Sequence, residues 1–231
     1  MTTDGSDVTV RLEVLDDPEA CAHRGAALIA AAARAAVAER DTCAIAVSGG
    51  STPWAMFAAL ADEDVPWDRI GIWQVDERVA PRGHQDRGLT HLQASLPRPE
   101  HIHPMPVDGD PANLAAHAVA YASGLPARFD LIHLGLGDDG HTASLAPGDP
   151  VLDVDDRDVA LTAEYRGRPR MTLTYPVLDR ARSVLFLATG PAKAEPLRKL
   201  LARDPSIPAA RVRAADQLAL ADRAAAGVTS S

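Results

Sequence analysis

The stretch Ala44–Pro53, with the sequence AIAVSGGSTP, indicates how the chain folds. Its first four residues form a short apolar run, which is typical of a buried β-strand, and its last six contain the small residues and proline of a tight turn into a helix. An apolar run followed by a helical pattern recurs along the chain. Such alternation favours βα units built around a mostly parallel sheet.

Further strands and helices are predicted on both sides of this unit. Strands are expected at Val8–Leu15, Ala44–Val47, Ile70–Val75, Leu131–Leu134 and Val184–Ala188. Helices are expected from Pro18 to about Arg40, from the SGGSTP turn through Leu60, near Leu89–Leu96, over Ala112–Ala122 and over Ala192–Arg203. No internal repeat, low-complexity linker or domain boundary interrupts this pattern. The sequence therefore predicts one α/β domain over residues 1–231.

The composition excludes several classes of protein. With 46% hydrophobic residues the chain is expected to fold, and its net charge of −9 argues against a nucleic-acid partner. Cys21 and Cys43 are too few for a disulfide framework, which indicates a reduced, cytoplasmic protein. Residues Met1–Asp7 have no signal-peptide pattern, and Arg34 interrupts the alanine-rich stretch 26–38, so no membrane association is expected.

The loop Ser48–Pro53 is a candidate phosphate site. Gly49 and Gly50 permit close backbone approach, and the helix that follows offers free N–H groups and the positive end of its dipole. An ordinary strand–turn–helix connection, with Ser51 or Thr52 as N-cap and Pro53 at the first helical position, uses the same geometry. Local sequence leaves both interpretations open.

A second candidate, Asp76-Glu77-Arg78, follows the predicted strand Ile70–Val75 in what is expected to be a polar loop. An acid beside a base at the carboxyl end of a strand is suited to orienting a hydroxylated, phosphorylated ligand. A surface ion pair of little energetic value is the alternative.

The loop Gly135–His141, with the sequence GLGDDGH, carries the most information. It matches the dinucleotide fingerprint G-x-G-x-x-G after a strand, but Asp138 and Asp139 would place two carboxylates against the pyrophosphate. The loop instead supplies an imidazole with nearby carboxylates. Histidine is the natural general base near neutral pH, and a carboxylate partner fixes its tautomer, so His141 is the candidate base.

Other polar clusters give weaker signals. His133 lies within a predicted strand and is expected to be either a hydrogen-bonded core residue or a half-buried one, while His101 and His103 form a lone HxH pair that is a poor metal signal. The acidic stretch Asp153–Asp158 fails the EF-hand pattern, because Arg157 occupies a ligand position and Asp158 replaces the required glycine. It is expected to be a solvated loop.

Two cationic positions complete the candidates. Of 23 basic residues only Lys193 and Lys199 are lysines, and Lys193 lies at a predicted helix start, where a cation opposes the helix dipole. An anionic ligand would offset that mismatch. Arg170 is suited to a bidentate phosphate contact, although an exposed strand-edge arginine is the alternative favoured by local sequence.

Taken together, these loops resemble the 6-phosphogluconolactonase family, whose superfamily also contains glucosamine-6-phosphate deaminase. The resemblance covers about Thr42 to Arg213 and rests on Ala46–Pro53, Asp76–Arg78, Gly135–Leu145, Arg170–Thr174 and Gly190–Ala194. It implies a single-domain three-layer α/β/α sandwich with a mostly parallel, Rossmann-like sheet of the NagB/RpiA-like type. It also implies hydrolysis of 6-phospho-D-glucono-1,5-lactone to 6-phosphogluconate in the oxidative pentose phosphate pathway, with no cofactor and no metal.

The resemblance also implies a role for each site residue. His141 would act as general base and acid, Asp139 would orient it in preference to Asp138, and Asp76 would position substrate hydroxyls or water. The residues expected to hold the phosphate or the sugar are Gly49, Gly50, Ser51, Arg78, Arg170 and Lys193. The expected partner is a small sugar-phosphate lactone, and the expected state is a monomer or a weak homo-oligomer.

Two alternatives remain, a glucosamine-6-phosphate deaminase and a non-catalytic sugar-phosphate sensor. Deaminases resemble DGHxxxxEP after the histidine, whereas this chain has Ala146 at the glutamate position, which favours the lactonase. A sensor of the transcription-regulator kind would need a DNA-binding extension, and the segment before Val8 is too short for one. Arg87-Gly88 and Ala146 depart from the family pattern and are expected to affect local substrate packing.

Overall fold

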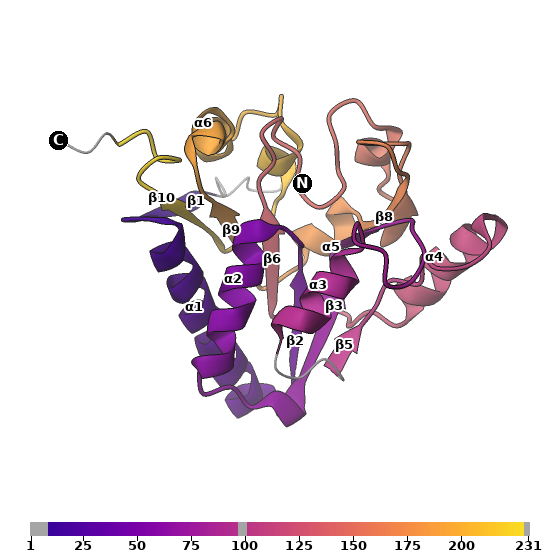
Figure 1. The fold of residues 1–231 in the computed structure, drawn as a ribbon, viewed down its shortest axis with the longest axis horizontal. Helices are drawn as coiled ribbons and strands as arrows, with labels where there is room; N and C mark the ends of the chain where they lie inside the picture. Colours follow the sequence, from indigo (N-terminus) through magenta and orange to yellow (C-terminus); the bar gives the residue numbers. More distant parts are fainter. Residues whose placement is uncertain (1–8, 97–100, 229–231) are drawn as a thin grey trace, which may run out of the picture.

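The protein is built around a parallel β-sheet (Figure 1) in a computed structural model that describes residues 9–96 and 101–228, apart from the side chain of Ser51. The strands are β1 (Val10–Leu15), β2 (Cys43–Val47), β3 (Ile70–Gln74), β5 (Ile102–His103), β6 (Leu131–Gly135), β9 (Ser183–Ala188) and β10 (Gln217–Asp222). They form a seven-stranded sheet in the order β1-β10-β9-β6-β2-β3-β5, and every pairing in it is parallel.

Helices cover both faces of this sheet. They are α1 (Pro18–Arg40), α2 (Ser51–Ala59), α3 (Gly88–Ser95), α4 (Leu114–Ser123), α5 (Tyr175–Asp179) and α6 (Ala194–Leu201). Leu131 of β6 packs in one apolar cluster with α1, α2 and α3, which lie in front of the sheet in Figure 1. Its neighbour Ile132 packs in a second cluster with α4, α5 and α6. Since successive strand residues point to opposite faces, this alternation confirms the three-layer α/β/α sandwich.

Each predicted helix and strand is present, with ends that differ by at most two residues from the expected ones. The start of the first strand, Val8, lies outside the described residues. Asp17 caps α1, because its carboxylate accepts a hydrogen bond from the Ala20 N–H at 2.8 Å, and Pro18 opens the helix as expected. None of the described helices is long and apolar enough to cross a membrane.

The expectation of a polar loop after β3 is wrong. Residues Asp76–Arg78 form a short strand, β4, that pairs antiparallel with β8 (Arg170–Leu173). A third strand, β7 (Val159–Leu161), completes a small second sheet in the order β4-β8-β7. Three charged residues carry no strand signal by themselves, and their pairing partner lies about ninety positions later in the sequence.

The strand order determines where a ligand can bind. After β2 the next strand in the large sheet is β3, which lies on one side of β2. After β6, which lies on the other side of β2, the next strand in this sheet is β9, and it lies still further away in that opposite direction. In open α/β sheets, ligands bind outside the carboxyl ends of the strands where the direction of connection reverses. The loops after β2 and β6, which are the glycine-rich candidates of the sequence, lie at this point.

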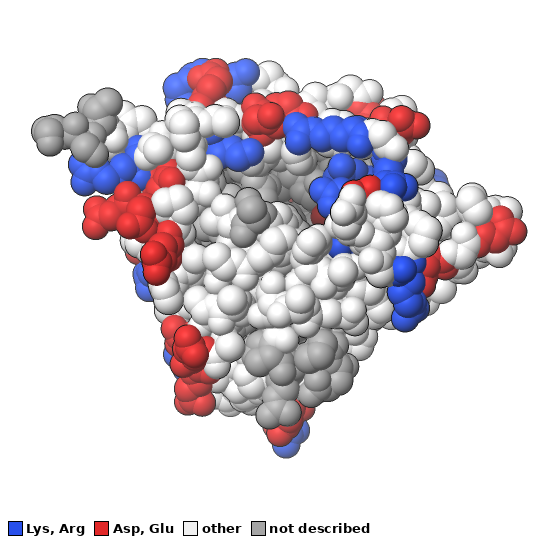
Figure 2. Space-filling model, viewed as in Figure 1, with Lys and Arg blue, Asp and Glu red and all other residues white. Residues whose placement is uncertain are grey.

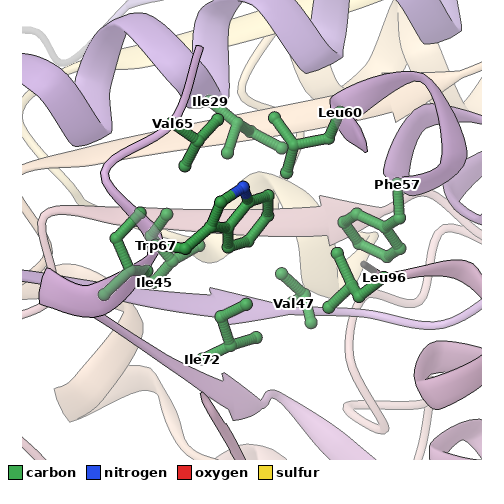
Figure 3. A pocket seen from close by; sticks show the side chains of 10 residues that line it. Ile29, Ile45, Val47, Phe57, Leu60, Val65, Trp67, Ile72 and Leu96 are labelled. Atoms are coloured by element: carbon green, nitrogen blue, oxygen red, sulfur yellow. The ribbon is translucent and has the colours of Figure 1, made fainter. Parts of the chain in front are cut away.

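The apolar cluster beneath α1 and α2 surrounds a small cavity (Figure 3). Figure 3 shows the ring of Trp67 in the middle of this cluster. Above it in the view lie Ile29, Leu60 and Val65, and below it lie Val47 and Ile72 of the sheet. Phe57 is 1% exposed and its ring also contacts the imidazole of His133 edge-on, with centroids 5.8 Å apart. Phe57 therefore joins α2 to the centre of the sheet.

We expect Phe57→Ala to lower the free energy of unfolding by about 3–5 kcal/mol, because the cavity that it leaves would merge with the existing one. Urea-induced unfolding followed by circular dichroism measures this change. Val119→Ala is the matched control, since Val119 on α4 is 71% exposed, and we expect it to change stability by less than about 0.5 kcal/mol. A loss below about 1 kcal/mol for Phe57→Ala would contradict the packing described.

Candidate active site

A cleft of about 470 Å³ opens at the carboxyl ends of β2, β3, β6 and β9. This volume falls within the range of small-molecule sites. The residues that line it include seven of the nine candidates from the sequence, namely Gly49, Gly50, Asp76, Arg78, His141, Arg170 and Lys193. Segments that are far apart in the chain thus meet around one space.

The first side of the cleft is the turn from β2 into α2. Gly50 is the N-cap of α2 and has φ 141°, a value that side chains strongly disfavour. The interpretation with Ser51 or Thr52 as N-cap is therefore wrong. Among the side chains that the structure describes, none caps this helix end, and the Thr52 hydroxyl is instead hydrogen-bonded to the Thr189 hydroxyl at 2.8 Å. Ser51 begins α2, and its side chain lies outside what the structure describes.

His141 and Asp139 form a hydrogen-bonded pair on the second side. His141 Nδ1 lies 2.5 Å from Asp139 Oδ1, and the backbone N–H of His141 donates to the same oxygen at 3.1 Å. A Cβ on Gly137 would lie 2.0 Å from His141 Nδ1, so only glycine allows this close approach. His141 lines the cleft, and Asp139 stands behind it.

Tyr165 is a neighbour of this pair that the sequence analysis missed. Its hydroxyl donates to Asp139 Oδ2 at 2.7 Å and lies 3.2 Å from His141 Nδ1. Burial by itself would raise the pKa of Asp139, but the hydrogen bonds from Tyr165 and His141 outweigh it and lower the pKa to about 2. The carboxylate is therefore charged at neutral pH. A lone tyrosine beyond β7 gives no signal in the sequence that would reveal this contact.

The small sheet supplies the third side. Asp76 Oδ2 accepts a hydrogen bond from the Ser144 hydroxyl at 2.5 Å, and Arg170 Nη1 lies 3.9 Å from the same oxygen. Arg170 is 6% exposed, so the alternative of an exposed strand-edge arginine is wrong. Burial lowers the pKa of Arg170, and its Nε has no hydrogen-bond partner within the described part of the chain. A buried guanidinium with a free donor suits an anionic ligand.

The interpretation of Asp76-Glu77-Arg78 as a surface ion pair is also wrong. Arg78 donates to the backbone oxygen of Asp86 at 2.8 Å. Glu77 is 2% exposed, and its carboxylate accepts hydrogen bonds from the Gly88 and Leu89 N–H groups at 2.9 and 2.8 Å. These are the first N–H groups of α3, so Glu77 caps that helix.

Arg87, one of the two departures from the family pattern, contributes to the same buried group. Its Nε lies 3.2 Å from the Glu77 carboxylate, with both side chains almost fully buried. It also donates to the Ala80 carbonyl at 3.1 Å. Gln74 adds a further donor to Glu77 at 2.9 Å. Arg87 is thus a structural partner of Glu77, while the adjacent Gly88 lines the cleft.

Cationic side chains are concentrated on this face of an acidic protein. Lys193 ends the 3₁₀ turn Pro191–Lys193, N-caps α6 and lines the cleft together with Arg166, a cation that the sequence analysis did not select. Arg166 pairs with Asp138 at 2.6 Å. Figure 2 shows Lys and Arg side chains on the rim of a hollow, with acidic side chains beside them. The rim is therefore suited to an anion.

One grouping of acidic and histidine residues in the described part of the chain approaches the geometry of a metal site. Asp138, Asp139 and His141 place one ligand atom each within 4.8 Å of one another. Each of the two carboxylates already has a strong protein partner, Arg166 for Asp138 and Tyr165 for Asp139. We therefore interpret the group as a hydrogen-bonded base rather than as a set of metal ligands.

The weaker sequence candidates lie outside the cleft. His133 is fully buried, so the half-buried alternative is wrong, and burial lowers its pKa to about 3, so that its ring is neutral. His103 stacks on Trp73 with centroids 4.1 Å apart. In the acidic stretch 153–158, Asp158 pairs with Arg180 and Asp156 pairs with Arg157.

The lowered pKa of Asp139 predicts a pH-dependent contribution to stability. Because the pKa falls from about 3.9 in an unfolded chain to about 2, this contribution is fully present above about pH 5 and is lost as the pH falls towards 2. We expect the unfolding free energy of Asp139→Asn to fall less steeply than that of the wild type over this range. Urea unfolding at several pH values measures it. Asp68→Asn, at an exposed position, is the control and should keep the wild-type slope.

Comparisons with known proteins agree with this geometry. Residues 16–220 match the family model for glucosamine-6-phosphate isomerases/6-phosphogluconolactonase. A 6-phosphogluconolactonase from Synechocystis is 39% identical over 207 residues, which cover 83% of this chain and 85% of that protein. The crystal structure of a 6-phosphogluconolactonase from Thermotoga maritima has a TM-score of 0.82 at 25% identity and covers 92% of this chain and 99% of its own. A 6-phosphogluconolactonase from Trypanosoma brucei shares the fold, with a TM-score of 0.85 at 24% identity and coverage of 97% and 100%. The chain belongs to the glucosamine-6-phosphate isomerase/6-phosphogluconolactonase family.

Proposed function

We propose that the protein is a 6-phosphogluconolactonase, which hydrolyses 6-phospho-D-glucono-1,5-lactone to 6-phosphogluconate in the oxidative pentose phosphate pathway. The observation that carries this proposal is the cleft itself, in which His141, hydrogen-bonded to Asp139 behind it, and the cations Arg170 and Lys193 face one space. A base and an anion-binding group in one cleft are what the hydrolysis of a phosphorylated ester requires.

In this proposal the phosphate lies at the glycine turn. Hydrogen-bond donors to the phosphate come from the backbone N–H groups of Gly49 and Gly50, from the start of α2 and from Ser51. Positive charge comes from Arg170 and Lys193. Arg78 contacts the phosphate or the sugar hydroxyls. The Asp76 carboxylate, held by Ser144, positions substrate hydroxyls or the attacking water.

The chemical step is an acyl transfer to water. His141 Nδ1 faces Asp139, so Nε2 is the nitrogen that takes the proton from water as the oxygen attacks the C1 carbonyl. The tetrahedral intermediate then collapses, the bond from C1 to the ring oxygen breaks, and His141 returns the proton to that oxygen. The carboxylic acid product ionises in solution. Asp139 remains a carboxylate and stabilises the charge on the imidazolium.

A glucosamine-6-phosphate deaminase is the second candidate from this family. Deaminases of the family resemble one another in having a glutamate five residues after the histidine. Here Ala146 occupies that position and is 3% exposed, so this position supplies no carboxylate for ring opening. This residue favours the lactonase over the deaminase.

We further propose that residues 1–231 act as one domain in the cytoplasm on a small sugar phosphate, as a monomer or weak homo-oligomer without nucleic acid as a partner. The net charge of −9 supports the last point, and the two free, buried thiols Cys21 and Cys43 are compatible with a reducing compartment.

The proposal is tested with freshly generated 6-phosphogluconolactone, by following 6-phosphogluconate formation through a coupled dehydrogenase assay. Hydrolysis must exceed the spontaneous rate measured without protein. Release of ammonia from glucosamine-6-phosphate would instead identify a deaminase, and binding of 6-phosphogluconate without turnover would identify a sensor.

His141→Ala tests the base. We expect kcat to fall by about 10²–10⁴-fold, because general base catalysis contributes about this factor. His23→Ala is the control, since His23 lies on α1 with a side chain that is 65% exposed, and it should retain wild-type turnover. Near-wild-type hydrolysis by a folded His141→Ala protein would refute the assignment.

Lys193→Ala tests the anion site against an internal control. We expect KM to rise by about 10–100-fold with kcat little changed, because a phosphate contact distant from C1 contributes equally to ground-state and transition-state binding. Lys199→Ala removes the other lysine of the chain, which pairs with Glu195 on α6, and should leave KM unchanged. Equal effects of the two variants would show that only net charge matters.

A further inference from the structure

We propose that Tyr165 is a positioning residue that holds His141 in the tautomer with its proton on Nδ1. The inference concerns a residue outside the motifs that identify the family, and its catalytic consequence rests on the proposed function. It is carried by the geometry of three side chains, Tyr165, Asp139 and His141.

A tight hairpin brings Tyr165 to the site. The strands β7 and β8 are joined through a turn in which Tyr165 and Arg168 pair, with Arg166 at φ 50° and Gly167 at φ 83° between them. Two left-handed residues at the centre are the mark of a type I′ turn, which fits the twist of a hairpin. Arg168 anchors this turn by donating to Asp86 at 2.7 Å.

The ring of Tyr165 is held independently of its hydroxyl. The guanidinium groups of Arg166 and Arg170 lie 5.2 and 5.1 Å from the ring centroid, within the range of cation–π contacts. The imidazole of His141 meets the same ring edge-on, with centroids 5.4 Å apart. Removing the hydroxyl alone therefore leaves the ring in place and isolates its hydrogen bond.

Counting donors and acceptors assigns the proton on His141. The Tyr165 hydroxyl has one proton, and it is directed to Asp139 Oδ2 at 2.7 Å. Its oxygen, 3.2 Å from His141 Nδ1, can then only accept. The other neighbour of Nδ1, Asp139 Oδ1 at 2.5 Å, is a carboxylate oxygen and also only accepts. Two acceptors face Nδ1, so Nδ1 carries the proton and Nε2 is left as the base.

The protonation state of Tyr165 supports this role. Burial and the hydrogen bond to Asp139 raise the pKa of Tyr165 to about 12, so that the phenol keeps its proton throughout the neutral range. The backbone N–H of His141 already holds Oδ1 of this carboxylate, whose side chain is 34% exposed, and the phenol adds a hydrogen bond at Oδ2 that further restricts its rotation. Asp139 thereby keeps Oδ1 on the imidazole.

The test compares Tyr165→Phe with the wild type in two measurements. ¹⁵N NMR of the labelled protein in mildly alkaline buffer reports the tautomer of the His141 ring, with His141→Ala identifying its signal. We expect the Nδ1–H form to dominate in the wild type, and its ratio to the Nε2–H form to fall by about tenfold in Tyr165→Phe, as for loss of one charge-assisted hydrogen bond. In the lactonase assay we expect kcat to fall by about tenfold while KM stays within about twofold.

A double-mutant cycle asks whether Tyr165 acts through Asp139. In an Asp139→Asn background, Tyr165→Phe should cause little further loss of kcat, because the group on which it acts is already altered. Tyr175→Phe is the matched control. Its hydroxyl donates to the Pro208 carbonyl at 2.9 Å and not to the site, so both the tautomer ratio and kcat should remain those of the wild type.

The outcomes separate the inference from the proposed function. An unchanged tautomer ratio in folded Tyr165→Phe overturns the inference whether or not the protein hydrolyses the lactone. If the enzyme is active, three results for Tyr165→Phe also overturn the inference. They are an unchanged kcat, a rise in KM alone, and a loss of kcat in the Asp139→Asn background equal to that in the wild type. A wild-type protein that does not accelerate hydrolysis refutes the proposed function, and the NMR measurement then still decides the role of Tyr165.

Discussion

The buried carboxylate of Glu77 is the interaction on which the arrangement of the cleft depends. An isolated charge at this depth would be strongly unfavourable, and the chain offsets that cost with donors from Gln74, Arg78, Gly88 and Leu89 and with the cation Arg87. These donors come from the end of β3, from β4 and from the start of α3. The Glu77 carboxylate therefore fixes three segments relative to one another. Because Asp76 and Arg78 flank Glu77 in β4, their positions are fixed as well.

The second constraint is the parallel sheet. Because its strands run in one direction, their carboxyl ends lie at a single edge, and the residues that follow β2, β6 and β9 must meet there. This brings Lys193, which follows β9, to the cleft, and the small antiparallel sheet adds Arg78 and Arg170, so that a chain with an overall charge of −9 gathers cations there. Charge is distributed by topology rather than by local sequence, since Arg78, Arg170 and Lys193 come from well-separated segments.

Features that depend on residues close together in the sequence can be predicted from it, whereas contacts between segments far apart in the sequence cannot. The helix at Pro18–Arg40 is predictable because Asp17 and Pro18 mark its start locally, and the convergence of the glycine loops follows from strand direction alone. The strand β10 is harder to detect, because alanines at alternate positions weaken its apolar signal. Three other interactions depend on segments that only folding brings together. They are the pairing of β4 with β8, the burial of Glu77 with Arg87, and the contact of Tyr165 with Asp139. The types of these residues gave no local indication of their partners.

The register of the small sheet places Arg78 directly opposite Arg170. Like charges at paired positions on antiparallel strands repel each other, and the charge on Arg78 contributes to the lowered pKa of Arg170. This repulsion is an unfavourable interaction in the folded protein, and a phosphate bound as proposed would offset it. Under the proposed function, this pair of arginines is therefore a position at which fold stability and phosphate binding oppose each other.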